Sequence, residues 1–560
     1  MKVSVGHSRR LPADLEAAVS DLLAKAVAED WAGRVWNRDT SVWTADEEVA
    51  KLIANRLGWL DLPTHFDDEV EPLAAFASAV RDEGFDAALV CGMGGSSLAP
   101  DVLAASFPPG DGGIAVRILD STDPAAVAAA GAASDPARTL YVISSKSGTT
   151  TETLAFLAHF WKAEDDIHPD IPQDAAAQHF AAVTDPPPSL EHIPHHDLLR
   201  EVFLNPPDVG GRYSALSYVG LVPAALICLD LRALLDSAAQ MAEDTRSPSA
   251  DNPGLWLGVA LGALCKAGRD KLTLVIEPGL ARLGAWIEQL VAESTGKHGV
   301  GLVPVDGETL GAPDVYGDDR VFVRISSGAN ASWQATSDAA LHKFVAAGHP
   351  VIDLTTSAGV GGLGAEFFRW EFATAVIGAA LNINPFDEPN VTESKDNTKR
   401  VLEQYGRTGN VAQAAALAPA DLSRHLKRVT ANGYFAIQAY IAQSESRDKA
   451  LRAAADALRD ATHHAVTVGY GPRFLHSTGQ LHKGGAPIGC FIQLTAARQE
   501  DLPIPGWKES FGTLIDAQAA GDFASLEAHG LPVARIDLGS DVDKGLADLS
   551  AAIKQATDTA

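Results

Sequence analysis

From Asp86 onward, short apolar runs alternate with Ala-rich stretches of helical spacing, and this alternation constrains the fold more than any other feature of the chain. Each run ends in Gly, Ser, Thr or Asp, and the first four are AALVCGMG, VRILDS, LYVISSKSG and AAVTDPP. Such runs are typical of buried strands, and their alternation with helices predicts a doubly wound parallel α/β sheet. Ligands of these sheets bind at the carboxyl ends of the strands. The polar residues after each run are therefore the first candidates for function.

The same alternation returns after a linker near 246–253. The new runs are KLTLVIEPG, VGLVPVDG, RVFVRISSG and HPVIDLTTS. We therefore expect an α/β protein with two doubly wound parallel-sheet domains. Three later runs, AVTVGYG, IGCFIQLT and LPVARIDLG, are expected to complete the second sheet.

The remaining segments suggest where these domains begin and end. Residues 1–80 are rich in Ala, Leu, Asp and Glu at helical spacing, which predicts an N-terminal helical arm. The first sheet domain is expected over 81–248 and the second over 249–560. Within the second domain we expect a helical insertion at about 397–462, followed by the C-terminal strands.

The charge of the chain excludes several classes of partner. It has 44 Lys and Arg against 72 Asp and Glu, a net charge of −28, which repels nucleic-acid backbones and anionic membrane surfaces.

Its four cysteines are scattered without a CxxC pair, as in reduced cytosolic proteins. No run has the length and apolarity of a signal peptide or a membrane-spanning helix. We expect a cytoplasmic protein, and any phosphorylated ligand must find a strongly local anion site.

One segment has the composition of such an anion site. Leu140–Thr153 reads LYVISSKSGTTTET, a buried strand followed by a polar turn and the start of a helix. A helix N-terminus offers unpaired N–H groups and a partial positive charge. The hydroxyls of Ser145, Ser147 and Thr150 add donors, which suits a phosphate monoester. The alternative is an ordinary helix capped by Ser or Thr, but so many neighbouring hydroxyls favour an anion.

A second turn, CGMGGSSLAP at Cys91–Pro100, is rich in glycine and also lies between a strand and a helix. Glycines let the backbone approach a ligand closely. The turn lacks the GxGxxG spacing of dinucleotide sites and the GK[ST] of P-loops. By itself it is compatible with a sugar, a nucleotide or plain packing.

Together, GMGGSS and SSKSGTTTET resemble the paired sugar isomerase (SIS) domains of glucose-6-phosphate isomerases. Four further segments support the resemblance, which runs from about residue 85 to 480: VGGRYS, EQLVAESTGK, INPFDEPNVTESK and LHSTGQ. The C-terminal part is similar to the isomerase half of bifunctional transaldolase/glucose-6-phosphate isomerases, and we expect the chain to represent that half alone. The resemblance implies two SIS domains, the interconversion of glucose 6-phosphate and fructose 6-phosphate in glycolysis and gluconeogenesis, and a homodimer.

The resemblance also implies roles for individual residues. The residues expected to carry the catalysis are Glu293 as the base, His476, Lys395 and Arg212. The residues expected to bind the sugar phosphate are Gly95, Ser96, Ser145, Lys146, Ser147, Thr150 and Gln289. In most family members the histidine lies between the glutamate and the lysine, whereas LHSTGQ follows both here. His342, in the usual interval, is therefore the alternative to His476, and His482 is a neighbour of interest.

The reaction explains why these residue types are needed. An aldose–ketose isomerisation moves a proton between adjacent carbons through an enediol, and a partly buried carboxylate such as Glu293 suits that task. A fixed guanidinium such as Arg212 stabilises the enediolate. A histidine, helped by Lys395, opens the sugar ring first. No step needs a metal or a redox cofactor, so we expect none.

Two alternatives stay open. Another SIS-type isomerase, acting on mannose 6-phosphate or an amino sugar, uses similar domains. A non-catalytic sugar-phosphate sensor is a different class, but a regulator of that kind carries a DNA-binding helix-turn-helix and a basic patch. The sequence shows neither, and its net charge is −28.

Overall fold

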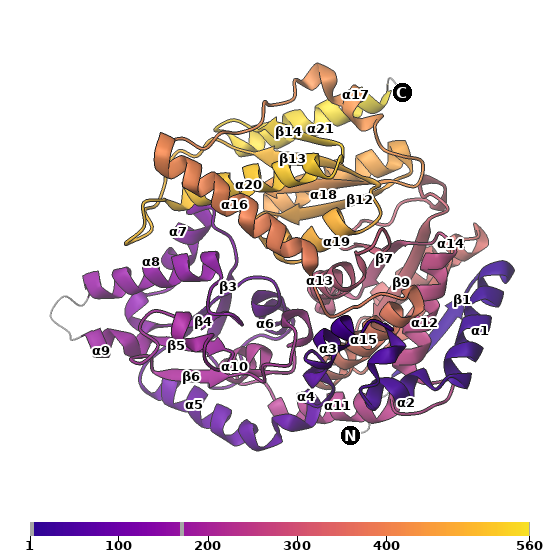
Figure 1. Ribbon diagram of the computed structural model, residues 1–560, viewed down its shortest axis with the longest axis horizontal. Helices are drawn as coiled ribbons and strands as arrows, with labels where there is room; N and C mark the ends of the chain where they lie inside the picture. The colour runs from indigo at the N-terminus through magenta and orange to yellow at the C-terminus, as the bar shows by residue number, and fades with distance from the viewer. Residues whose placement is uncertain (1–4, 168–172, 559–560) are drawn as a thin grey trace.

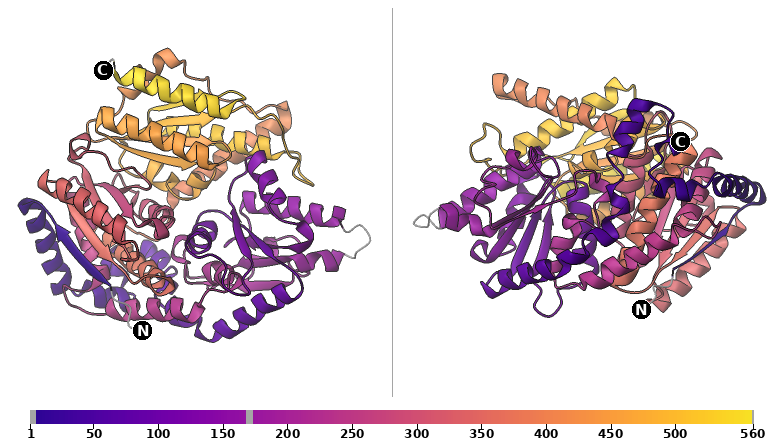
Figure 2. Two further views of the ribbon diagram at one scale, coloured as in Figure 1. Left: turned by 180° about the vertical axis from the view of Figure 1, so that it is seen from behind. Right: turned by 60° about the horizontal axis from the view of Figure 1, so that its bottom comes forward.

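The computed structural model of the chain describes residues 5–167 and 173–558. Its strands form three sheets, of five, five and four strands, arranged around the centre of the molecule (Figure 1). The view from behind shows the same arrangement (Figure 2). Among the described residues, no helix combines the length and the apolar character that crossing a membrane requires.

The first sheet has the order β3-β2-β4-β5-β6, and all of its strands are parallel. The strands are β2 (Ala87–Cys91), β3 (Ala115–Leu119), β4 (Thr139–Ser144), β5 (Phe180–Thr184) and β6 (Glu201–Leu204). The four runs predicted as the first strands are all confirmed. β2, β4 and β5 are buried along their whole length, as expected for central strands covered by helices on both faces. The helices of this part are α5 (Val70–Asp82), α6 (Gly95–Ser106), α7 (Pro124–Ala132), α8 (Thr151–Ile167), α9 (Gln173–Ala176) and α10 (Tyr218–Leu226).

The second sheet has the order β1-β10-β9-β7-β8. Its strands are β1 (Gly6–Arg10), β7 (Lys271–Ile276), β8 (Val303–Val305), β9 (Arg320–Ser326) and β10 (Val351–Thr355). The four runs predicted for this sheet are confirmed as β7 to β10, and they are parallel. The helices around it are α11 (Leu231–Asp244), α12 (Pro253–Lys266), α13 (Leu283–Thr295), α14 (Ala331–Ala346) and α15 (Val360–Leu381).

The N-terminal arm expected over 1–80 is mostly helical, but it begins with a strand that the sequence did not predict. β1 pairs antiparallel with β10 at the outer edge of the second sheet, and Arg10 forms an ion pair of 2.7 Å with Asp353. GHSRR has no apolar periodicity, and its strand conformation comes from backbone pairing with a distant edge. The helices of the arm follow: α1 (Ala13–Ala28), α2 (Trp31–Trp36), α3 (Glu47–Ala54) and α4 (Leu62–His65).

The three late strands form a third sheet instead of completing the second. This sheet is parallel, in the order β12-β11-β13-β14, and its strands are β11 (Tyr434–Tyr440), β12 (Ala465–Tyr470), β13 (Gly489–Thr495) and β14 (Val533–Asp537). The edges of the second sheet are taken by β1 and β8. The helical insertion expected at about 397–462 is also wrong, because β11 interrupts it. YFAIQAY is buried throughout, and a short apolar run of this kind is not distinguished from a helix by periodicity.

The helices around the third sheet are α16 (Pro389–Thr408), α17 (Leu422–Leu426), α18 (Glu445–Thr462), α19 (Gly479–Gly484), α20 (Phe511–Ala528) and α21 (Val542–Asp558). α19 lies toward the centre of the molecule, beside α13, whereas α17 and α21 lie at its outer edge (Figure 1). Because α6, α13 and α19 lie together at this centre, side chains from all three sheet regions can line one cavity.

Candidate active site

A cavity of about 410 Å³ lies where the carboxyl ends of the first sheet face α13 and α16. Its lining residues are Arg56, Met93, Gly94, Gly95, Ser96, Lys146, Ser147, Thr150, Asp185, Ser189, Gly211, Arg212, Gln289, Glu293, Glu388, Val391, Lys395 and His476. Every residue that the sequence analysis expected at the site lines this cavity, except Ser145. The structure thus brings together residues that are up to 381 positions apart in the chain, from Gly95 to His476.

The polar turn between β4 and α8 forms one wall. The hydroxyl of Ser145, behind the wall, donates to the hydroxyl of Thr150 over 3.0 Å. Gly148 has a φ of +66°, and a Cβ there would lie 2.0 Å from the carbonyl oxygen of Ser189, so only glycine fits. The turn leads into the 17-residue helix α8. Hydroxyls and a helix N-terminus therefore converge here, as an anion site requires.

The ammonium of Lys146, in this turn, has two partners within the protein. Its ammonium forms an ion pair with Asp185 and donates to the carbonyl oxygen of Pro207 over 3.1 Å. Burial raises the pKa of Asp185, while Lys146 acts in the opposite direction. Asp185 follows β5, at the same edge of the sheet, and it was not identified from the sequence.

The glycine-rich turn after β2 brings other parts of the protein close together. A Cβ at Gly95 would lie 2.1 Å from the carbonyl oxygen of Gly211, the residue before Arg212. Gly94 has a φ of +55°, and a Cβ there would lie 2.7 Å from the carbonyl oxygen of His476. These glycines are therefore needed for close approach of backbone from two other segments, in addition to any contact with a ligand.

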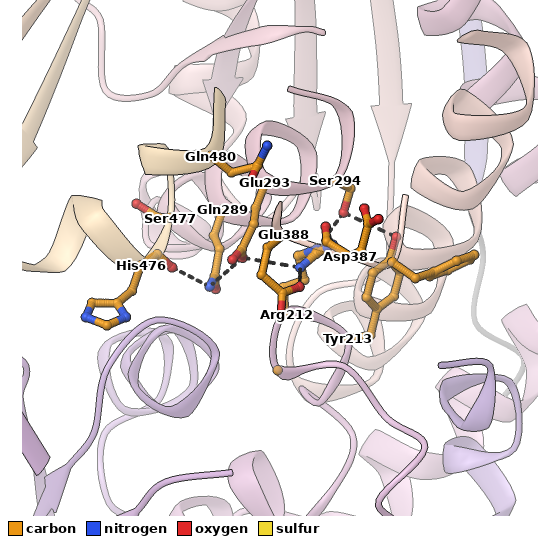
Figure 3. Close-up of polar contacts among 12 residues, drawn as sticks. Arg212, Tyr213, Gln289, Glu293, Ser294, Asp387, Glu388, His476, Ser477 and Gln480 are labelled. Carbon is orange, nitrogen blue, oxygen red and sulfur yellow. Dashed lines mark hydrogen bonds and ion pairs between the residues drawn. The ribbon is translucent and has the colours of Figure 1, made fainter. Parts of the chain in front are cut away.

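Arg212 is held by contacts on all of its nitrogens (Figure 3). Nε donates to the hydroxyl of Ser294 over 2.7 Å, and Nη2 donates to the carbonyl oxygen of Pro385 over 2.9 Å. Nη1 lies 3.0 Å from a carboxylate oxygen of Glu388 and 3.6 Å from Oε2 of Glu293. The side chain is 3% exposed, so its charge is fixed in place beside two carboxylates.

A buried lysine holds the loop that receives Arg212. Nζ of Lys297 donates to the carbonyl oxygen of Asn384 over 2.8 Å and to the carboxylate of Asp387 over 2.6 Å. Burial lowers the pKa of Lys297 to about 8. The segments EQLVAESTGK and INPFDEPNVTESK are thus joined by Lys297 and Arg212, which the sequence motifs did not reveal.

Glu293 and Gln289 lie one turn apart on the same face of α13. Nε2 of Gln289 donates to Oε2 of Glu293 over 3.2 Å and to the carbonyl oxygen of His476 over 2.7 Å (Figure 3). Burial raises the pKa of Glu293 to about 7; Arg212 acts against this rise, and the charge of Glu388 adds to it. The site therefore contains a carboxylate that titrates near neutral pH, as a general base requires.

His476 ends the short 3-10 turn Arg473–His476, and its ring pairs with a buried glutamate. Nε2 of His476 lies 2.9 Å from Oε1 of Glu152, in the first turn of α8. Burial alone raises the pKa of Glu152, but the charge and hydrogen bond of His476 hold it below its ordinary value. Sequence reasoning missed Glu152, although its place inside SSKSGTTTET, directly behind the expected phosphate turn, was a usable signal.

The two other histidines named from the sequence, His342 and His482, do not line this cavity. His342 is exposed on α14 and does not line the cavity. His482 is buried, with the centroid of its ring 5.1 Å from that of Phe491, and burial lowers its pKa well below the ordinary value. Lys395, exposed on α16, lines the cavity together with His476.

Within residues 5–167 and 173–558, no group of three His, Cys, Asp or Glu side chains is placed to hold a metal ion. A carboxylate of raised pKa, a fixed guanidinium, a histidine–carboxylate pair and a turn rich in hydroxyls line one cavity between parallel sheets. This combination of fold and site defines a class of α/β enzymes whose active site lies at the carboxyl ends of parallel strands.

Comparison with known proteins identifies the family. The family model described as phosphoglucose isomerase matches residues 83–319. A glucose-6-phosphate isomerase from Rubrobacter xylanophilus is 30% identical over 410 residues, covering 64% of this chain and 92% of the relative. One from Thermus thermophilus is 32% identical over 289 residues, covering 50% of this chain and 66% of the relative. The chain belongs to the glucose-6-phosphate isomerase family, a family of aldose–ketose isomerases, as the sequence motifs predicted.

Solved structures share the fold. A glucose-6-phosphate isomerase from Chlamydia trachomatis has a TM-score of 0.55 and 20% identity, and the match covers 72% of this chain and 89% of the other. A hypothetical protein from Thermus thermophilus has a TM-score of 0.58 and 24% identity, and the match covers 70% of this chain and 100% of the other. The predicted α/β architecture with parallel sheets is therefore confirmed.

Proposed function

We propose that this chain interconverts glucose 6-phosphate and fructose 6-phosphate, with Glu293 moving the proton between C1 and C2. The observation that carries the proposal is the 3.6 Å approach of Glu293 to Arg212, in the same cavity as the anion-binding turn and His476. The alternatives, another sugar-phosphate specificity or a sensor without activity, are not favoured, because the relatives reported above are named glucose-6-phosphate isomerase.

The phosphate group binds at the turn between β4 and α8. Lys146 supplies the positive charge, Ser147 and Thr150 supply hydroxyl donors, and Ser145 holds Thr150 through the 3.0 Å hydrogen bond. The N-terminus of α8 adds backbone donors. Gly95 and Ser96, across the cavity, contact the sugar.

Ring opening comes first, because hexose phosphates are mainly closed rings. With Nε2 of His476 engaged by Glu152, Nδ1 is the nitrogen that remains for the substrate. Nδ1 takes the proton of the C1 hydroxyl, the C1–O5 bond breaks as the C1 carbonyl forms, and the same proton passes to O5. Lys395 assists at this end of the cavity.

Proton transfer follows on the open chain. Glu293 takes the proton from C2, the electrons of that C–H bond form the C1–C2 double bond, and negative charge develops on O1. Arg212 stabilises that charge without reorganisation. The proton then returns to C1, while the hydroxyl proton of O2 passes to O1, which leaves the carbonyl on C2. Gln289 holds the reacting oxygen of Glu293 throughout.

The proposal extends to the location and assembly of the protein. The four cysteines are free, which favours a cytoplasmic location. The family resemblance favours a homodimer with a small-molecule sugar phosphate as its substrate.

The test measures fructose 6-phosphate conversion through a coupled dehydrogenase, with a chelator present and no added metal. Glu293→Gln should abolish the exchange of the C2 proton with deuterated solvent while sugar-phosphate binding persists. A purified, folded chain that gives no turnover would contradict the proposed function. Turnover that survives Glu293→Gln would contradict the role of the base.

A further inference from the structure

The carboxylate that pairs with His476 has a second partner from the third sheet region. Nε2 of Gln518, on α20, donates to Oε1 of Glu152 over 2.6 Å. This is the same oxygen that lies 2.9 Å from Nε2 of His476. Oε1 of Gln518 accepts a hydrogen bond from the hydroxyl of Thr122 over 2.7 Å. A continuous chain of polar contacts thus runs from Thr122 through Gln518 and Glu152 to the histidine.

The side chains of Thr122, Gln518 and Glu152 are almost entirely buried. Thr122 is 0% exposed, Gln518 2% and Glu152 5%. A hydrogen bond to an ionised carboxylate is strong in such surroundings, and an unpaired polar atom there is costly. The contacts among these side chains therefore determine how the carboxylate of Glu152 is oriented and how its charge is held.

The two partners of the Gln518 amide together fix its orientation. An ionised carboxylate only accepts hydrogen bonds, so Glu152 takes the NH₂ end of the amide. A reversed amide would set its oxygen against the oxygen of Glu152 and be repelled. The amide oxygen therefore faces Thr122, whose hydroxyl donates to it.

Thr122 is itself held by the residues beside it. It lies in the loop between β3 and α7, and the flanking Asp120 and Asp123 face arginines of the third sheet region. The guanidinium of Arg473 donates to Asp120 over 2.7 Å, and Nε of Arg498 lies 3.7 Å from a carboxylate oxygen of Asp123. The loop is thus tied to the third sheet region on both sides of Thr122.

We propose that Gln518, whose amide oxygen is held by the hydroxyl of Thr122, is a positioning residue for ring opening. It acts through Glu152, by holding the carboxylate ionised and aimed at Nε2 of His476, so that Nδ1 presents its lone pair to the sugar. This inference rests on the proposed function of His476. It gives the third sheet region a direct part in catalysis, because Gln518 reaches the site from α20 without contacting the substrate.

The experiment separates ring opening from isomerisation. In a Glu293→Gln background, proton transfer between carbons is blocked, while ring opening and closing still exchange the α and β anomers of glucose 6-phosphate. NMR exchange spectroscopy measures that anomer exchange directly. Adding Gln518→Met, which keeps the size of the side chain and removes its donor and acceptor, should slow enzyme-dependent anomer exchange about 10- to 100-fold.

Gln493→Met is the matched control. Gln493 is also a buried glutamine of the third sheet region, and its amide donates to the carbonyl oxygen of Ala519, the residue after Gln518, over 3.0 Å. It has no contact with Glu152, so its loss should leave anomer exchange unchanged. Thr122→Val removes the hydroxyl at nearly constant shape and should slow anomer exchange as Gln518→Met does. Thr122→Ser keeps a hydroxyl and should retain the rate of anomer exchange.

The outcomes are distinguishable. In the otherwise unaltered chain, Gln518→Met should lower kcat for glucose 6-phosphate and leave KM nearly unchanged. Anomer exchange in Gln518→Met equal to that in Gln493→Met, with Thr122→Val also unaffected, would overturn the inference. If the Glu293→Gln background does not accelerate anomer exchange although the unaltered chain isomerises, the role of His476 fails and the inference with it. Failure of the proposed function is seen separately, as an unaltered chain without turnover.

Discussion

Oε2 of Glu293 lies 3.6 Å from Nη1 of Arg212, and the same guanidinium nitrogen lies 3.0 Å from a carboxylate oxygen of Glu388. Two carboxylates thus share one buried positive charge. Burial and the charge of Glu388 raise the pKa of Glu293, while the charge of Arg212 lowers it. In the proposed reaction Arg212 is a fixed cation beside the oxygen on which negative charge develops.

The pH dependence of kcat/KM should report this arrangement. Glu293 must be ionised to accept a proton, and its pKa is raised to about 7, so activity should rise with pH up to and through neutrality. Glu388→Gln removes a negative charge that raises this pKa, so the acid limb should move to lower pH. Steady-state assays from pH 5 to 9 measure the shift, with the exposed Glu445→Gln as the control. An acid limb at the same pH in Glu388→Gln and in the unaltered chain would contradict the effect of Glu388 on the pKa of Glu293.

Lys146→Met should weaken phosphate recognition. The change removes the ammonium at the turn between β4 and α8, and a hydrogen bond to a charged group is worth about 1.5 to 3 kcal/mol. KM for fructose 6-phosphate should therefore rise about 10- to 100-fold, and inhibition by inorganic phosphate should weaken in parallel. Lys162→Met, on an exposed position of α8, should change neither value. Equal KM values in the two variants would contradict a role of Lys146 in phosphate binding.

Gly95→Ala should disable the site without any change of charge. The added Cβ would lie 2.1 Å from the carbonyl oxygen of Gly211, so the loop carrying Arg212 must shift, and small displacements of catalytic groups cost about 100-fold in rate. Gly210→Ala is the matched control, because its Cβ would meet only ordinary contacts, at 3.7 Å. Comparing kcat and the melting temperature of both variants checks the prediction.

Glu371→Met should stabilise the chain. Both carboxylate oxygens of Glu371, in the middle of α15, are buried without a hydrogen-bond partner in the described structure, and burial raises its pKa well above the ordinary value. The unfolded chain therefore loses this proton at lower pH than the folded chain, so Glu371 lowers stability as pH rises above about 4.5. The gain from Met, on the order of 1 to 3 kcal/mol, should be larger at pH 8 than at pH 5 in urea unfolding. The exposed Glu403→Met should show no such gain.

Added salt should raise kcat/KM. The net charge of −28 repels a dianionic substrate at long range, and salt screens that repulsion beyond about 10 Å at 0.1 M. Assays at low substrate concentration, in potassium chloride from about 10 to about 200 mM, span this screening range and test the sign of the effect. If kcat/KM fell steadily with added salt, the electrostatic field around the cavity would attract the substrate instead.

Much of the site was predictable because its parts are continuous in sequence. The turn Ser145–Thr150 follows a buried strand and opens a helix, and both signals lie within one short segment. The same holds for Gln289 and Glu293, which one helix places on one face. In the fold, eight apolar runs were confirmed as strands of the expected sheets, since buried strands with polar ends are visible locally.

Pairing between distant segments was not predictable. β1 is a strand only because the edge of β10 lies beside it. The sequence predicts β12, β13 and β14 as strands, but their assembly with β11 into a third sheet depends on tertiary packing. The similarity to bifunctional transaldolase/isomerase proteins and the homodimer stay predictions.

The sequence by itself determined the residue types of an isomerase and the local elements that carry them, because strand ends, helix starts and residues one helical turn apart follow from local conformation. Only the tertiary structure decided that His476, and not His342, faces the cavity, and that Glu152 and Gln518 stand behind it. Those contacts join residues hundreds of positions apart. They form when buried polar groups must find partners across packed elements, a requirement that no single segment of sequence expresses.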